Sequence, residues 1–347
     1  MLERRYLKAA RLLLAMTSYA PPLARRVVCA PSEGKDERNA RLSGRLYRPA
    51  AGRVRGSLLL VHGLNVLTIE DPRLIRFSTA IAALGYEVYT PQVPELGHYS
   101  VTASALDRLR SHIIHHARTN AGLAPIGLVG FSFAGGLALA AASDERVSSH
   151  LAYVASIGGY HDLARTMRYA ATGVVEGPGG ARARGTNPYS ELALVCAALP
   201  YLCEEPTSAL RGSLQSLMDG EAERARELAS ALGTPDGRRI FELASRGELA
   251  SLRPMLLRLI ESRSAELERV SPRGRLSGIK SRVLMLHGAY DDMIPPEETI
   301  LAEAELRADH CANYHVLVTP ALGHVDVANS PNPGELVRLT GLVARLL

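Results

Sequence analysis

The chain has 347 residues, of which 47% are hydrophobic and 22% charged. This composition supports a sizeable buried core and excludes a disordered, collagen-like or disulfide-scaffold protein. The net charge is +5, but only three residues are lysines and the arginines are spread along the chain. Nucleic-acid binding usually shows a clustered basic surface, so we expect no nucleic-acid partner.

The first predicted element is an amphipathic helix close to the N-terminus. Apolar residues recur at helical spacing over residues 2–16, while arginine and lysine occupy the other side. Such a helix either docks on the protein's own core or lies on an anionic membrane surface. We assign residues 1–30 to this N-terminal helical segment, with peripheral membrane contact as one prediction for it.

The cysteines and the hydropathy pattern bear on the compartment. The four cysteines have neither the spacing of a zinc site nor the density of a disulfide framework. No uninterrupted run of about 18 apolar residues occurs, as a membrane-spanning helix would require. These features predict a cytoplasmic protein.

Short apolar segments alternate with helical patterns through the first half of the chain. Strands are predicted at residues 42–47, 57–61, 87–89, 126–129 and 151–157, and helices at 73–84, 102–118 and 134–143. Strands that alternate with helices form a mostly parallel sheet covered on both faces. The predicted fold class is therefore α/β.

The alternation then stops for a long stretch. Residues 162–275 show helical patterns rich in Leu, Ala, Glu and Arg, and no comparable aliphatic strand. The glycine-rich stretch at 177–180 is predicted to be a flexible connector. Strands resume at 283–286 and 314–318, followed by a terminal helix near 334–347.

This pattern predicts one domain with an insertion. Residues 31–161 and 276–347 would form the core, and residues 162–275 would form a helical insertion between two of its strands. No dinucleotide fingerprint or phosphate-binding loop is present, which disfavours nucleotide-dependent chemistry.

The most specific motif is GFSFAGG at residues 130–136, between a buried strand and a helix. A serine on such a sharp turn projects its hydroxyl and requires very small residues two positions to either side. Gly130 and Ala134 meet this requirement around Ser132, although alanine replaces the usual second glycine. The alternative is a helix-capping serine in a glycine-rich turn.

With this motif the sequence resembles the α/β-hydrolase superfamily, over roughly residues 42–160 and 275–347. The superfamily's chain order is serine, acid, histidine. The resemblance implies that Ser132 is the nucleophile, Asp291 in the HGAYDDMIP segment is the acid, and His324 after Gly323 is the base. It also implies an α/β-hydrolase fold with a helical lid formed by the insertion, and no cofactor or metal.

This residue set suits nucleophilic catalysis. A serine hydroxyl is a poor nucleophile until a neutral imidazole can accept its proton. Asp291 would orient that imidazole and stabilise the imidazolium that forms. Two other carboxylates stay open as candidates for the acid: Asp162, which follows the strand after the nucleophile, and Asp292.

The tetrahedral intermediate also needs preorganised hydrogen-bond donors. By the same resemblance these are the backbone amides of Phe133 and Leu64, the latter directly after His62-Gly63 at the end of an early strand. Asn65 could add a side-chain donor, but its expected role is to stabilise the loop.

Three histidines on one predicted helix are a weaker signal. His112, His115 and His116 lie at i, i+3 and i+4, a spacing that can bind a metal. The carboxylate of Asp107 in the same helix points away from them. We therefore expect a solvated helix surface and no metal site.

Together these residues predict a serine hydrolase that cleaves a small-molecule carboxylic ester. Apolar residues of the insertion would line a pocket for a moderately hydrophobic substrate. Amide, peptide or carbon–carbon bond hydrolysis and acyl transfer use the same triad and stay open as alternatives. A non-catalytic binding module on this fold is a further alternative.

Overall fold

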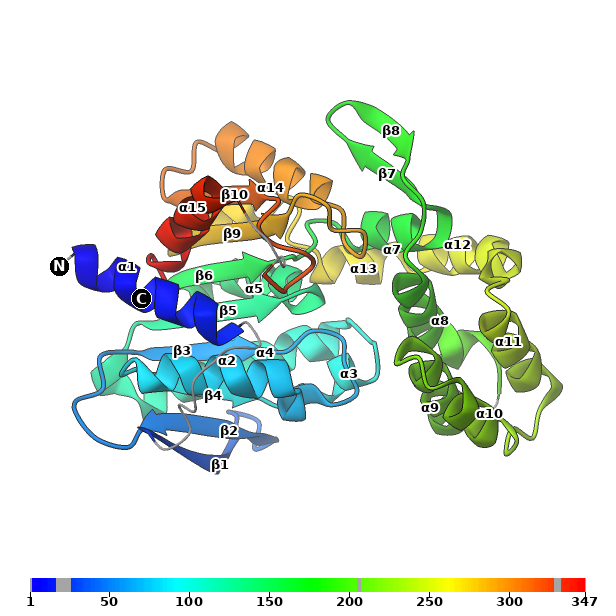
Figure 1. The fold of residues 1–347 in the computed structure, drawn as a ribbon, viewed down its shortest axis with the longest axis horizontal. Coiled ribbons are helices and arrows are strands. Elements are labelled where there is room, and N and C mark those ends of the chain that lie inside the picture. The colour runs from blue at the N-terminus through cyan, green and yellow to red at the C-terminus, as the bar shows by residue number, and fades with distance from the viewer. Residues whose placement is uncertain (1, 17–25, 205–206, 328–331, 347) are drawn as a thin grey trace.

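The computed structural model describes residues 2–16, 26–204, 207–327 and 332–346, and its centre is an eight-stranded sheet (Figure 1). The strand order is β1-β2-β4-β3-β5-β6-β9-β10. All neighbours from β4 to β10 pair in parallel, whereas β1 and β2 pair antiparallel and β2 pairs antiparallel with β4. The strands are β1 Val27–Lys35, β2 Arg41–Pro49, β3 Ser57–Val61, β4 Glu87–Pro91, β5 Ile126–Phe131, β6 Leu151–Ile157, β9 Arg282–Gly288 and β10 Tyr314–Thr319.

The central strands are apolar because both of their faces are covered. Every residue of β3 and β4 is buried, and so is all of β9 except its first residue. Such continuous apolar strands are typical of a parallel sheet between two helical layers. The predicted α/β class and the mostly parallel sheet are confirmed.

Helices cover both faces of the sheet. Apolar side chains of α1, α2 and α15 join one cluster, and those of α4, α5 and α14 join the cluster on the other side. The helices of the core are α1 Leu2–Met16, α2 Pro72–Ala83, α3 Pro94–Gly97, α4 Ala103–Thr119, α5 Phe133–Ala142, α6 Glu145–Ser148, α14 Glu297–Ala308 and α15 Pro333–Val343.

The predicted N-terminal helix is present as α1, and its apolar stripe faces the protein. Ala9 and Leu12 are fully buried, while Leu7 and Leu14 are exposed. The helix packs against α2 and α15, as Figure 1 shows. Among the described residues, no helix is long and apolar enough to cross a membrane. Contact of α1 with a membrane surface stays a prediction.

The N-terminal segment assigned from the sequence, residues 1–30, also contains the start of an unexpected strand. β1 begins at Val27 and pairs with β2 along its whole length. It lies at the edge of the sheet and most of its residues are exposed. An edge strand with little burial lacks the apolar alternation by which strands are recognised in a sequence.

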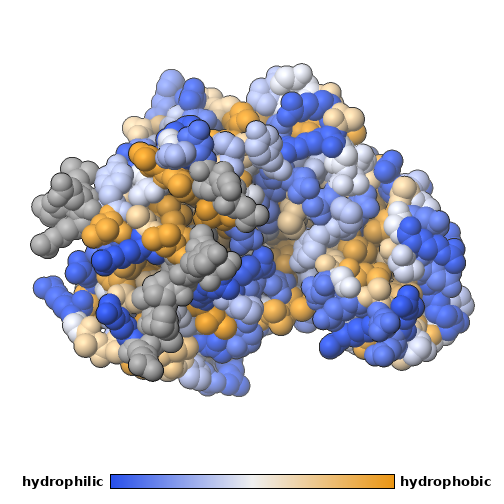
Figure 2. All heavy atoms as spheres, in the orientation of Figure 1, coloured by the Kyte–Doolittle hydropathy of each residue, from blue (hydrophilic) through white to orange (hydrophobic). Residues whose placement is uncertain are grey.

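A helical insertion follows β6 and ends before β9, at the right of Figure 1. In Figure 2 hydrophilic side chains predominate along its outer rim, while hydrophobic ones gather further in. Its inner residues form a separate apolar cluster that includes Val195, Leu199 and Leu214. Its elements are α7 Leu163–Thr172, β7 Val174–Gly177, β8 Gly180–Ala183, α8 Pro188–Leu202, α9 Thr207–Met218, α10 Ala222–Ala229, α11 Pro235–Ser245, α12 Arg253–Ser262 and α13 Ser264–Val270.

One expectation within the insertion was wrong. The stretch at 177–180 is the tight turn of a two-stranded hairpin, β7–β8, and not a flexible connector. Gly180 has a φ of 92°, a conformation that glycine adopts without a steric penalty. The hairpin strands are four residues long and largely exposed, so they carry no aliphatic run.

The histidines of α4 do not form the solvated surface that the sequence suggested. His112 and His116 are buried, and only His115 is partly exposed. Hydrogen bonds join the His112 ring to the Tyr89 hydroxyl at 2.8 Å and the His116 ring to Ser57 Oγ at 2.7 Å. Polar partners on β3 and β4 thus allow this face of α4 to pack on the sheet. Within the described residues, no group of three or more His, Cys, Asp or Glu side chains could hold a metal ion.

Candidate active site

Ser132 occupies the turn between β5 and α5. Its backbone has φ 55° and ψ −133°, a conformation that is rare and costly for any residue other than glycine. Two hydrogen bonds hold the turn: the Ser132 amide donates to the Ile157 carbonyl at 2.8 Å, and its carbonyl accepts from the Gly135 amide at 2.7 Å. The sheet and the helix therefore jointly fix the position of the hydroxyl.

The small residues around Ser132 are required by close backbone contact. A Cβ atom on Gly130 would lie 2.1 Å from the Ala134 carbonyl oxygen, which no side chain tolerates. A Cβ on Gly135 would lie 2.6 Å from Ser156 Oγ. Ala134 itself is fully buried, so its methyl group fits where the superfamily usually has glycine.

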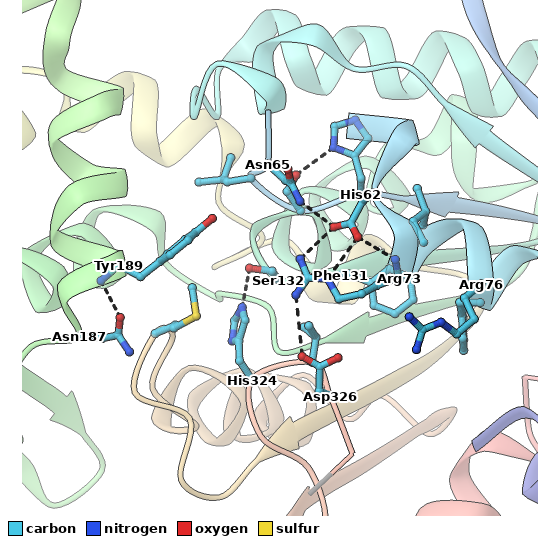
Figure 3. A pocket seen from close by; sticks show the side chains of 17 residues that line it. His62, Asn65, Arg73, Arg76, Phe131, Ser132, Asn187, Tyr189, His324 and Asp326 are labelled. Carbon is cyan, nitrogen blue, oxygen red and sulfur yellow. Dashed lines mark hydrogen bonds and ion pairs between the residues drawn. The ribbon is translucent and has the colours of Figure 1, made fainter. Parts of the chain in front are cut away.

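Ser132, His324 and Asp291 lie together in one hydrogen-bonded chain, although they come from distant parts of the sequence (Figure 3). His324 Nε2 is 2.7 Å from Ser132 Oγ, and His324 Nδ1 is 2.6 Å from Asp291 Oδ2. A carboxylate can only accept, so Nδ1 carries the proton and Nε2 is free to accept from the serine hydroxyl. This is the arrangement in which an imidazole can take a proton from serine.

Asp291 lies at the end of β9 and is only 2% exposed. Its Oδ1 accepts hydrogen bonds from the amides of Met293 at 2.9 Å and Ile294 at 3.1 Å. Burial by itself would raise the pKa of this carboxyl, but contacts from His287 and His324 outweigh it and hold the pKa well below its usual value. Asp291 is therefore a carboxylate at neutral pH.

The two alternative acids lie in other surroundings. The Asp162 carboxylate accepts from Arg273 Nη1 at 2.8 Å and from the Arg165 amide at 3.0 Å, where it caps α7. Asp292 is exposed, and its carbonyl accepts the hydroxyl of Tyr169 at 2.8 Å. Of the three carboxylates, Asp291 is the one joined to His324.

Leu64 and Phe133 lie on the two segments that adjoin Ser132. Phe133 is the first residue of α5, and amides in the first turn of a helix have no acceptor within the helix. Leu64 follows His62-Gly63 after β3, and a Cβ on Gly63 would be only 3.1 Å from Ser132 Cβ. Within the described part of the chain, the Leu64 amide has no hydrogen-bond acceptor. Both amides could thus serve a developing oxyanion.

The loop that carries Leu64 is held by a network that the sequence analysis missed. Asn65 Nδ2 donates to Asp71 Oδ2 at 2.6 Å, and Asn65 Oδ1 accepts from the Leu67 amide at 2.8 Å. Asp71 also accepts from the amide of Arg73 at 2.8 Å and from its Nη2 at 2.9 Å. Asn65 therefore stabilises the loop, as expected. An Asp directly before Pro72 is a helix-start signal that could have identified Asp71.

A cavity of about 340 Å³ opens beside Ser132 and His324. Figure 3 shows it between the loop after β3, the start of α2 and residues Asn187 and Tyr189 of the insertion. Its wall includes His62, which burial keeps neutral by lowering its pKa to about 4. The cavity can accommodate a small molecule next to the serine hydroxyl.

Several solved structures are similar to this chain at low sequence identity. Dipeptidyl peptidase 4 of Porphyromonas gingivalis is 12% identical, with a TM-score of 0.53 over 92% of this chain and 35% of that protein. An acylaminoacyl peptidase of Pyrococcus horikoshii is 11% identical, with a TM-score of 0.51 over 89% of this chain and 40% of that protein. An acetyl xylan esterase from Paenibacillus sp. R4 is 14% identical, with a TM-score of 0.48 over 94% of this chain and 86% of the esterase.

The likeness to the two peptidases shows the fold alone. The chain spans less than half the length of the two peptidases. No curated protein sequence matches the chain. A model of the alpha/beta hydrolase family matches residues 58–339, well over half of the chain and a range that includes Ser132, Asp291 and His324. The chain belongs to the alpha/beta hydrolase family.

Proposed function

We propose that this protein is a serine hydrolase that cleaves carboxylic esters of moderately hydrophobic substrates. One observation carries the proposal: the hydrogen-bonded chain of Ser132, His324 and Asp291 ends in a hydroxyl that faces a cavity large enough for a small molecule. This arrangement supports nucleophilic catalysis through an acyl-enzyme.

In the proposed reaction Ser132 Oγ attacks the ester carbonyl while His324 Nε2 accepts the hydroxyl proton. The amides of Leu64 and Phe133 donate to the oxyanion of the tetrahedral intermediate. His324 then returns the proton to the leaving oxygen, the carbon–oxygen bond breaks and the alcohol departs. Water, activated in the same way by His324, attacks the acyl-enzyme and releases the carboxylic acid.

A second, smaller cavity of about 40 Å³ supports an apolar acyl site. It is lined by the side chains of Leu64 and Phe133, whose amides are the proposed oxyanion donors, together with Met167 of α7 and Leu194 of α8. An acyl carbon chain that extends past the oxyanion amides would enter this apolar space. Its size favours a short chain, and its walls give the insertion the role of a lid.

The test combines labelling of the nucleophile with a substrate panel. We expect a fluorophosphonate to label the wild-type protein at Ser132 and to leave Ser132→Ala unlabelled. We expect p-nitrophenyl acetate and butyrate to be hydrolysed, and longer esters and the matching anilides to be poor substrates. The wild type and Ser132→Ala are compared at equal concentration.

Three results would count against the proposal. If neither short nor longer esters were cleaved although Ser132 reacted with the probe, the ester assignment would fail. If anilides were cleaved faster than esters, amide hydrolysis would replace it. If Ser132 did not react with the probe at all, the binding-module alternative would gain support.

A further inference from the structure

We infer that the alcohol released by this enzyme carries an anionic group, a carboxylate or a phosphate, which is bound by Arg76 with help from Arg73 of α2. This inference rests on the proposed esterase function and adds the chemical class of its leaving group. It starts from the position of His324 and from the charges in the wall of the larger cavity.

The larger cavity lies on the leaving-group side of the site. His324 must protonate the leaving oxygen, so the alcohol has to lie beside its ring. His324 and the two residues after it line the cavity of about 340 Å³. Among the residues that line the smaller apolar cavity, His324 is absent. The ester would therefore place its alcohol in the larger cavity and its acyl group in the smaller one.

Two arginines of α2 contribute to the wall of this larger cavity. Arg73 and Arg76 are three residues apart and so lie on the same side of the helix. Figure 3 shows the Arg73 side chain extending toward Asp326 and the Arg76 side chain beside it along the same wall. Both arginines thus line the space that a leaving alcohol would occupy.

The two arginines differ in how their charges are balanced. Arg73 is held by Asp71, which accepts from its Nη2 at 2.9 Å and its Nε at 3.2 Å. Its Nη1 is 3.8 Å from Asp326, which is too long for a hydrogen bond. Arg76 is exposed and, within the described part of the chain, has no carboxylate partner. The wall thus carries two arginines and two aspartates, and Arg76 is the arginine whose guanidinium group has no carboxylate beside it among the described residues.

Such a wall suits an anion with two or more oxygens. A guanidinium group binds carboxylate and phosphate oxygens through paired hydrogen bonds, and Arg73 Nη1 offers a further donor. Asp326 repels an anion, but its side chain is 65% exposed, and water and salt screen its charge as they screen that of the exposed Arg76, so the paired hydrogen bonds of the guanidinium group decide the preference. The balance favours an anionic over a neutral leaving group, and removal of Asp326 should increase that preference.

The test uses two acetate esters: 3-acetoxybenzoate, whose leaving phenol carries a carboxylate, and methyl 3-acetoxybenzoate, whose leaving phenol carries a neutral methyl ester. The measured quantity is the ratio of their kcat/KM values. We expect the wild type to favour the anion, Arg76→Gln to lower the ratio about tenfold, and Arg76→Lys to retain most of it. Asp326→Asn should raise the ratio, and 0.5 M salt should reduce it. Arg239→Gln, at an exposed position on α11, is the matched control and should leave the ratio unchanged.

A second readout does not depend on ester cleavage. 3-Hydroxybenzoate should slow fluorophosphonate labelling of Ser132 more than its methyl ester does, and Arg76→Gln should remove that difference. The inference is overturned, while the esterase function stands, if both acetates are cleaved with equal kcat/KM. The same holds if Arg76→Gln changes neither the ratio of the two kcat/KM values nor the protection of Ser132 from labelling. If neither acetate is cleaved but protection is anion-selective and depends on Arg76, the esterase function fails and the anion site stands.

Monophenyl succinate separates the two sides of the ester. Its carboxylate is on the acyl group, and we expect its kcat/KM to be lower than that of phenyl butyrate because the acyl cavity is mostly apolar and its charged lining residue, Arg263, is paired with Glu266 at 2.8 Å. If monophenyl succinate were preferred and Arg76→Gln abolished that preference, the anion would have to bind on the acyl side. That result would overturn the assignment of the anion to the leaving group.

Discussion

At Asp291, burial and hydrogen bonding act on the carboxyl group in opposite directions. The side chain is removed from solvent, which disfavours its charge, yet His324 and two backbone amides donate to it, and His287 Nε2 lies 3.3 Å from its Oδ2. His287 is itself fixed, because its ring contacts Thr299 Oγ1 at 2.7 Å and the Ile294 carbonyl at 2.9 Å. This environment holds both the charge and the orientation of Asp291.

We therefore expect Asp291→Asn to reduce kcat for ester hydrolysis by about three to four orders of magnitude. An amide at this position can donate to His324 Nδ1, which favours the tautomer that cannot accept a proton from Ser132. Steady-state kinetics with p-nitrophenyl acetate measures the loss. Circular dichroism checks that the variant is folded.

Asp162→Asn is the matched variant for the alternative acid. It weakens the contact with Arg273, and its measurable effect should be on stability, with turnover within a few-fold of the wild type. Near wild-type turnover in Asp291→Asn, together with a large loss in Asp162→Asn, would transfer the catalytic role to Asp162.

Only some residues of the candidate site could be predicted from the sequence. Ser132, His324 and Asp291 sit in short motifs with fixed spacing to a strand, so their meeting could be predicted from chain order. Asp71, Arg73 and Arg76 carry no such pattern. They lie at the site because the turn after β3 folds back and α2 begins beside that turn. Only the tertiary structure shows this course of the chain.

At the scale of a single element, α4 shows how polar residues can face a core. Burial lowers the pKa of His116 to about 4 and that of His112 to about 3, so both rings are neutral in the folded protein. In the unfolded chain their pKa returns to about 6.5. The unfolded state thus binds protons at a higher pH than the folded state does.

The consequence is an acid-labile helix. The stability contributed by the neutral rings is complete above pH 6.5 and is lost as the pH falls toward 4. His116→Gln removes one of these titrations. Between pH 6.5 and 4 the free energy of unfolding should therefore fall in both proteins, but by about 3 kcal/mol less in the variant than in the wild type. Urea denaturation at a series of pH values measures the difference.

Ser57→Ala provides the control for this experiment. It removes one of the hydrogen-bond partners of the His116 ring but keeps the titrating group, so it should lower stability while retaining the loss on acidification. If His116→Gln showed the same pH dependence as the wild type, the proton uptake would have to be assigned to other groups.

Helices and strands could be predicted from the sequence where their burial requires a regular pattern of apolar residues. The central strands β3, β5, β6, β9 and β10 appear as apolar runs and were found close to their true bounds. β1 and the β7–β8 hairpin were missed because exposed strands need no apolar residues. The buried histidines of α4 were misplaced because polar residues at helical spacing predict a solvent face unless their partners on neighbouring strands are known.

At the scale of the whole molecule, the insertion is partly independent and partly joined to the core. Helices α8 to α11 pack around their own apolar cluster. In contrast, Ile260, Leu267 and Val270 of α12 and α13 belong to the cluster that covers the sheet. The insertion therefore cannot separate from the core without exposing apolar surface of both.

A buried ion pair reinforces this junction where the chain leaves β6. Glu298 of α14 accepts from Arg165 Nε at 2.6 Å and Nη2 at 2.9 Å, and from the amides of His161 and Asp162 at 2.9 and 2.8 Å. Glu298 is 2% exposed, and the Arg165 side chain is 11% exposed. One carboxylate thus joins the first turn of the insertion to a helix of the core.

Removing this carboxylate should destabilise the protein strongly, because it leaves a guanidinium and two amides without their acceptor in a buried site. We expect Glu298→Ala to lower the free energy of unfolding by about 3–5 kcal/mol in urea denaturation. Arg165→Met removes the other charge, so the double variant should lose less than the sum of the two single variants, with a coupling of about 1–3 kcal/mol. Strict additivity of the single effects would show that the two charges do not interact, and the junction would then rest on apolar packing alone.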